Sequence, residues 1–78
     1  SRTRFAHEFQ HAFGQGPIAY LTEWRLQRAA AQLRRTNQRI ADIAYGNGYS
    51  NAAAFSRAFS LKFGVSPSHA RRRARSGT

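Results

Sequence analysis

The sequence predicts an all-α fold, and two observations support that prediction. The first is a repeat: FAHEFQHAFGQGPIAY, which begins at Phe5, returns fifty positions later as FSRAFSLKFGVSPSHA, which begins at Phe55. The second is periodicity, because apolar residues recur three and four positions apart and no segment alternates as a β-strand would. A chain of 78 residues fits one small domain, or a fragment of one, whose helices share their apolar faces.

Each copy of the repeat predicts a helix, a tight stop and the start of a new helix. Phenylalanines at positions i, i+4 and i+8 form an apolar stripe, a glycine follows where a left-handed C-cap is needed, and a proline suits the next first turn. These residues are Phe5, Phe9, Phe13, Gly14 and Pro17 in the first copy, and Phe55, Phe59, Phe63, Gly64 and Pro67 in the second.

The first helix is expected over residues 2–13, with Ser1 as its N-cap. We expect its phenylalanine stripe to lie in the core, as most such stripes do. The second helix begins at Pro17 and continues to about Thr36. Its apolar face, with the spacing i, i+3, i+4 and i+7, consists of Leu26, Ala29, Ala30 and Leu33.

A third helix is expected over residues 40–47 and a fourth over residues 51–63, with Asn51 as the N-cap of the fourth. They are joined by the segment Gly48-Tyr49-Ser50. Two helices joined by a short turn that contains glycine are the signature of a helix-turn-helix, so residues 40–63 predict one.

A fifth helix begins at Pro67, behind the N-cap Ser66, and extends to Arg75. Residues 76–78 are expected to form a flexible tail. The chain then divides into a first helix with its stop (1–16), a long linker helix (17–36), a second helix-turn-helix with a C-terminal helix (37–75), and the tail.

The charge of the chain predicts a polyanionic partner. Lys and Arg number 13 against 3 acidic residues, which gives a net charge of +10 and a pI of about 11.9. All of these cations except Lys62 are arginines, whose planar fork suits phosphate oxygens and guanine edges. Nucleic acid is therefore favoured, and a membrane-active cationic helix is a weaker alternative because Gly and Pro joints divide the chain into packed pieces.

Several other classes are disfavoured. Cysteine is absent, so neither disulfides nor a thiolate metal site is available, and a reducing cytosol is compatible with the composition. The sequence has no apolar run of membrane-spanning length and no signal-peptide pattern. Because the chain starts without Met at a helix N-cap, we expect that upstream sequence is missing.

The segment IADIAYGNGYSNAAAFSRAFSLKFGVSP resembles the second helix-turn-helix of AraC/XylS-type bacterial transcriptional regulators. The segment SRTRFAHEFQHAFGQGPIAYLTEWRLQRAAAQL resembles the first recognition helix of that family and its linker helix. The resemblance implies two helix-turn-helix units whose recognition helices enter successive major-groove segments, with the first unit incomplete here. A linker helix of about 20 residues is roughly 30 Å long, close to the ~34 Å turn of B-DNA.

The resemblance also implies which residues contact base edges. In the first helix the family comparison points to Thr3, Ala6 and His7, and the orientation of the stripe adds Gln10. The corresponding surface of the fourth helix carries Ala52, Ala53, Ser56 and Arg57. Arg57 is the only long hydrogen-bond donor among these four, and guanine O6 and N7 are its natural partners.

Phosphate contacts are expected from the remaining cations and from nearby polar side chains. Arg39 has the strongest case because a helix N-terminus that faces DNA already favours phosphate. The cluster Arg71, Arg72, Arg73 and Arg75 is either a solvated basic segment or a phosphate clamp. The full set of phosphate candidates is Arg2, Arg25, Arg39, Asn51, Ser60, Arg71, Arg72 and Arg73.

Three positions depart from the family pattern. Arg39 stands where Ser or Thr usually begins a capping box with Asp42, Asn47 replaces an apolar residue, and Ala70 replaces an aromatic one.

The string His7-Glu8-Phe9-Gln10-His11 matches the zinc-protease motif HExxH, but no downstream segment offers a third zinc ligand and Phe9 belongs to the stripe.

We therefore expect a sequence-specific DNA-binding domain of a bacterial transcription regulator, without catalytic residues, metal or cofactor. Double-stranded DNA is the expected partner, together with RNA polymerase and an effector or dimerisation domain outside this chain, in the cytoplasm at the nucleoid. A nonspecific basic or architectural nucleic-acid-binding module is the alternative; it would explain the charge but not the repeat or the turn.

Overall fold

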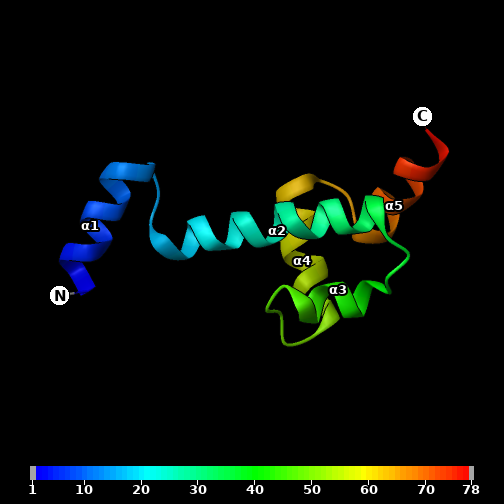
Figure 1. Ribbon diagram of the computed structural model, residues 1–78, viewed down its shortest axis with the longest axis horizontal. Helices are drawn as coiled ribbons and strands as arrows, with labels where there is room; N and C mark the ends of the chain where they lie inside the picture. The colour runs from blue at the N-terminus through cyan, green and yellow to red at the C-terminus, as the bar shows by residue number, and fades with distance from the viewer. Residues whose placement is uncertain (1, 78) are drawn as a thin grey trace.

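The computed structural model describes residues 2–77 and is entirely helical in its regular structure over that range, as the sequence predicts. The helices are α1 (Arg2–Phe13), α2 (Pro17–Arg35), α3 (Ile40–Gly46), α4 (Ala52–Phe63) and α5 (Pro67–Ser76). Figure 1 shows α1 at one end of the long helix α2, while α3, α4 and α5 gather around the other end. The molecule is elongated, with principal extents of 46 × 26 × 19 Å.

The two copies of the repeat end their first helices in the same way. Gly14 and Gly64 have φ values of +77° and +78°, in the left-handed region that favours glycine. The amide nitrogen of Gly14 lies 2.8 Å from the carbonyl oxygen of Gln10, and Gly64 makes the same 2.8 Å bond to Ser60. The predicted helix stops are thus confirmed in both copies.

Helix starts also follow the predicted caps. The Asn51 Oδ1 atom accepts a 2.7 Å hydrogen bond from the Ala54 amide, and the Ser66 Oγ atom accepts one of 3.1 Å from the His69 amide. Asn51 lies just outside α4, as a cap does. The predicted cap Ser1 lies outside the described residues.

Some predicted boundaries are displaced by a residue. Thr36 and Asn47 are C-caps and not the last residues of α2 and α3. Ser76, expected from the sequence to belong to the tail, is the last residue of α5, and its hydroxyl lies 3.5 Å from the carbonyl oxygen of Arg73. Helix ends fray and their assignment commonly shifts by this amount.

The core lies where α2, α3 and α4 meet. Its fully buried apolar residues are Leu26, Ala29, Leu33, Ile43, Ala44, Phe55 and Phe59. The second phenylalanine stripe is therefore a core stripe, as expected: Phe55 is 0% and Phe59 1% exposed. Burying each of these rings stabilises the fold by about 1.5–3 kcal/mol.

The first stripe is not buried, and the expectation that it lies in the core is wrong for this chain. No residue of α1 is buried, and the side chains of Phe5 and Phe13 are 56% and 55% exposed. The rings of Phe9 and Phe13 pack on each other at 4.5 Å and on Tyr20 of α2 at 5.4 and 5.1 Å. The physical reason is that α1 packs mainly against the start of α2, so one side of the stripe has no opposing surface among residues 2–77.

Candidate nucleic-acid interface

The outer face of α4 is the best-supported part of the interface, because the buried rings on its other face orient it. Ala53 and Arg57 are exposed, and Ala52 and Ser56 are half-buried beside them. Within the part of the chain that the structure describes, Arg57 makes no ion pair or hydrogen bond. Its guanidinium is consequently available to a partner outside the chain.

The α3–α4 turn sets the angle at which α4 leaves α3. Gly48 has φ +91°, and a Cβ atom placed there would lie 2.9 Å from the Cζ atom of Arg25. The guanidinium of Arg25 thus covers the turn from α2, and the residue is half-buried. The side chain of the phosphate candidate Arg25 therefore lies against the α3–α4 turn and not in open solvent.

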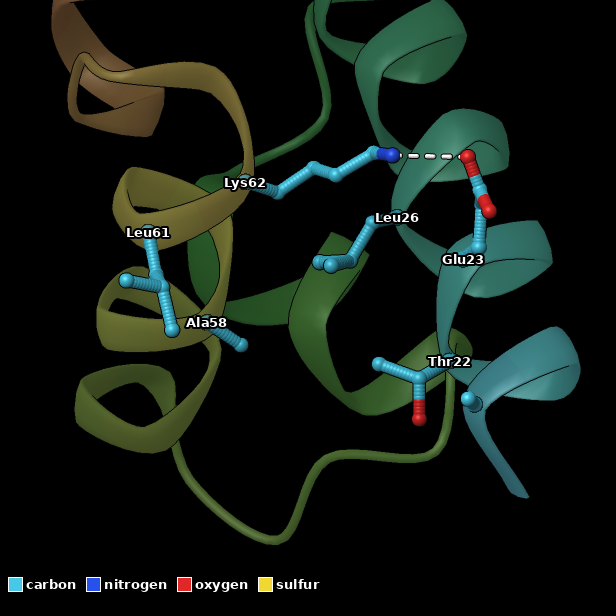
Figure 2. Close-up of a pocket in the computed structure, with 7 residues that line it drawn as sticks. Thr22, Glu23, Leu26, Ala58, Leu61 and Lys62 are labelled. Atoms are coloured by element: carbon cyan, nitrogen blue, oxygen red, sulfur yellow. Dashed lines mark hydrogen bonds and ion pairs between the residues drawn. The ribbon is translucent and has the colours of Figure 1, made fainter. Parts of the chain in front are cut away.

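Figure 2 shows how α4 is attached to α2, across a groove of about 400 Å³. The Lys62 Nζ atom of α4 lies 2.6 Å from the Glu23 Oε1 atom of α2, while Leu26 fills the space between the helices. The hydrogen bond from Lys62 and the charge of its ammonium hold the pKa of Glu23 below its ordinary value. Sequence patterns do not pair these residues, which are 39 positions apart.

Asn47 joins α3 to α2 from within the core. The residue is only 3% exposed, and its Nδ2 atom donates to the Gln32 Oε1 atom at 2.7 Å and to the Ile43 carbonyl at 2.8 Å. Its Oδ1 atom is buried without a partner among the described residues. This departure from the family's apolar residue is thus accommodated as a polar link between two helices, at the cost of one unsatisfied acceptor.

Arg39, the other departure at α3, is the N-cap residue but its side chain caps nothing. It instead pairs with Asp42, with 3.2 Å between Nε and Oδ2, and both side chains are well exposed. Exposed pairs of this kind contribute little to stability, so the guanidinium can exchange Asp42 for a phosphate oxygen.

On α1 the four base-contact candidates, Thr3, Ala6, His7 and Gln10, are all exposed. Helix α1 is attached to α2 by the aromatic contacts to Tyr20, and the turn that follows α1 adds a 3.5 Å hydrogen bond from Gln15 to Glu23. The structure therefore presents these side chains to solvent but supports their helix less firmly than α4. His7 and His11 are exposed on the same helix, and residues 2–77 contain no group of three His, Asp or Glu side chains that could hold a metal ion.

The remaining phosphate candidates differ in their surroundings. Arg2, Arg72 and Arg73 are exposed, and Ser60 is half-buried on α4. The Arg71 side chain is half-buried and donates hydrogen bonds to backbone carbonyls at the end of α2. Arg71 lies 38 positions after Leu33 and 35 positions after Thr36, so the sequence pattern contains no signal for this contact.

Comparisons with known proteins agree with this geometry. A family model described as a helix-turn-helix domain matches residues 1–73. The HTH-type transcriptional regulator AlkR of Acinetobacter baylyi is 47% identical over 91% of this chain and 23% of its own length. The HTH-type transcriptional activator RclR of Escherichia coli, described as RCS-specific, is 39% identical over 96% of this chain and 26% of its own length. The chain thus spans about a quarter of these curated relatives.

Among solved structures, a transcriptional regulator from Chromobacterium violaceum, with an AraC-type DNA-binding domain, superposes with a TM-score of 0.89. The two sequences are 28% identical, and the match covers all of this chain and 70% of the other. No helix within residues 2–77 is both long enough and apolar enough to cross a membrane.

Proposed function

Because the chain belongs to the AraC-type family of helix-turn-helix DNA-binding domains, we propose that α1 and α4 enter successive major-groove segments on one face of a DNA duplex. Sequence-specific DNA binding in a transcription regulator is the function of this family, which is a family of DNA-binding domains and not of enzymes. Both helices are attached to α2, whose 19 residues span about 28 Å, close to the ~34 Å pitch of B-DNA.

The observation that carries the proposal is the orientation of α4. Its aromatic face is locked into the core by Phe55 and Phe59, so Ala53 and Arg57 must face outward. Arg57 donates to guanine O6 and N7, and the methyl group of Ala53 suits a thymine methyl. Ala52 and Ser56 lie beside them, so one strong base contact dominates this half-site.

Helix α1 contributes the second set of base contacts, from Thr3, Ala6, His7 and Gln10. The Gln10 amide suits the N6 and N7 atoms of adenine, whereas Ala6 offers only a methyl group. Around both helices, phosphate contacts come from exposed or half-buried polar side chains: Arg2, Arg25, Arg39, Asn51, Ser60, Arg72 and Arg73. Such contacts position the protein on the duplex and carry no sequence information by themselves.

The proposal also includes partners outside this chain, namely a further domain of the whole protein and RNA polymerase. The longer relatives support an effector or dimerisation domain outside this chain, and regulation of transcription brings the DNA-bound protein to RNA polymerase. The bacterial cytoplasm, at the nucleoid, is the compartment in which that DNA is found. Within this chain we assign no catalytic residue and no cofactor.

Binding-site selection with the wild-type chain and with Arg57→Ala tests the proposal. Removal of a bidentate base contact should cost about 1–3 kcal/mol on the selected site and relax one guanine position. Arg35→Ala is the matched control, since it removes the same charge from an exposed position of α2. An Arg57→Ala motif and affinity equal to those of wild type would show that Arg57 does not contact a base.

The net charge of +10 favours a second function, nonspecific nucleic-acid binding. The two differ in the ratio of affinities for the selected site and for random duplex DNA at physiological salt. Specific binders show ratios of about 10³ or more. A ratio near one would establish the nonspecific module instead.

A further inference from the structure

The arginines of α5 point in two directions. Arg71 and Arg75 are four residues apart and therefore share one face of the helix, whereas Arg73 lies on the opposite face with His69, and Arg72 lies on the flank between the two faces. Arg71 is half-buried, while Arg72, Arg73 and Arg75 are exposed; Arg75 differs from Arg72 and Arg73 in its hydrogen bonds to Thr36 and Asn37. The sequence shows only one dense run of positive charge; the structure separates it into two pairs.

The first pair is bonded to the end of α2. The last carbonyl groups of a helix have no partner within the helix. The Arg71 Nε atom donates to the Leu33 carbonyl at 3.2 Å, and its Nη2 atom donates to the Thr36 carbonyl at 3.3 Å. Arg75 donates from Nη2 to the same Thr36 carbonyl at 3.3 Å and also to the side chain of Asn37.

These bonds have a favourable electrostatic setting. The C-terminus of a helix carries partial negative charge, so two guanidinium groups there are stabilised by its dipole. Hydrogen bonds from a charged donor are stronger than neutral ones, and Leu33, whose carbonyl accepts one of them, is only 1% exposed. The planar fork of arginine also matches two carbonyls at once, which a lysine ammonium does not.

Arg72 and Arg73, the second pair, form no ion pair with an acidic side chain among residues 2–77. Each of the three acidic side chains forms an ion pair with another cation: Glu8 with Arg4, Glu23 with Lys62, and Asp42 with Arg39. Helix α5 itself contains no acidic residue. Two adjacent, exposed guanidinium groups in such surroundings are suited to an external anion.

We propose that Arg71 and Arg75 form a brace between α5 and the C-terminus of the linker helix, and that Arg72 and Arg73 bind the phosphate backbone of the DNA. The assignment of Arg72 and Arg73 rests on the proposed function. The brace holds α5 with its inner face on α2, which leaves the outer pair exposed, with Arg73 directed away from α2 and Arg72 on the flank of the helix. The segment is thus a structural element and a binding element within five residues.

Two double variants that each remove two charges separate these roles: Arg71→Gln with Arg75→Gln, and Arg72→Gln with Arg73→Gln. Each is measured for its thermal midpoint Tm and for the dependence of DNA affinity on salt, with the selected duplex, well below Tm. The outer-pair variant should keep the wild-type Tm. Its plot of log affinity against log salt should be shallower by about 0.9 for each phosphate that the variant no longer neutralises.

The brace variant should show the opposite result, a lowered Tm and an unchanged salt slope. Lysine substitutions provide a second test that does not depend on the brace variant folding. Arg72→Lys with Arg73→Lys should restore the salt slope because charge is retained, whereas Arg71→Lys with Arg75→Lys should restore Tm only in part.

An equal decrease of the salt slope in both glutamine variants would overturn the separation into a brace pair and a phosphate-binding pair, because all four arginines would then contribute to phosphate binding. A wild-type Tm in the brace variant would overturn the brace. Failure of the wild-type chain to bind any duplex would refute the proposed function itself and the phosphate role with it, while the Tm comparison would still decide whether the brace exists.

Discussion

Replacing Phe59 by alanine should unfold a large fraction of the chain, whereas replacing its repeat partner Phe9 should not. Phe59 is 1% exposed and packs on Phe55 and Phe63 at 5.6 and 4.6 Å. Truncating a buried phenylalanine costs about 3–5 kcal/mol. A core of this size supplies only about 3–5 kcal/mol in total, so the cost is comparable to the whole stability.

Phe9 provides a matched control because it is the same residue type at the same repeat position. Its ring packs on Phe5, Phe13 and Tyr20, on a face that is otherwise open. Aromatic pairs of this kind contribute about 0.5–1.5 kcal/mol each, and here the effect is confined to α1 and the start of α2. The unfolding of the α2–α5 core should therefore remain close to that of the wild type.

Urea titration followed by circular dichroism gives the free energy of unfolding of both variants. Thermal melts give the same ranking, since 1 kcal/mol corresponds to about 4–8 °C in a domain of this size. Equal destabilisation by the two substitutions would refute the reasoning, because it would mean that the first stripe is as deeply packed as the second.

Three local features give further predictions. Amide hydrogen exchange should be faster over residues 5–13 than over 55–63; equal protection in a monomer would show that the first stripe is already buried. The lowered pKa of Glu23 means that its bridge to Lys62 stabilises the fold at neutral pH and that this contribution disappears as acid protonates the carboxylate. Glu23→Gln should therefore flatten the acid side of a plot of Tm against pH, and an unchanged profile would argue against the bridge. Gly48→Ala should cost about 1–2 kcal/mol, because φ is +91° and the new methyl group meets the Arg25 guanidinium; a wild-type Tm would show that the turn relaxes freely.

Helix starts and stops could be predicted from the sequence alone. The caps at Asn51 and Ser66 and the left-handed glycines Gly14 and Gly64 act through hydrogen bonds within four residues. Such interactions depend on neighbours that the chain itself supplies, so their pattern is visible in a single sequence. The all-α class follows from the same local signals.

The outward face of α4 could be predicted as well, because a buried stripe determines which side of a helix remains free. The buried rings of Phe55 and Phe59 leave Arg57 exposed, as expected. The assignment of individual bases and phosphates to these side chains stays a prediction, since it depends on the geometry of a duplex outside the chain.

Only the tertiary structure decided which of two nearly identical stripes is buried. The repeat predicts the same stripe twice, yet Phe55 is 0% exposed and Phe5 is 56% exposed. A stripe is buried when distant segments provide the opposing surface. Helix α4 packs against α2, α3 and α5, whereas α1 packs mainly against the start of α2. The same reason separates Arg71 from Arg72: adjacent arginines differ in role because one lies over the carbonyl groups at the end of α2 and the other does not.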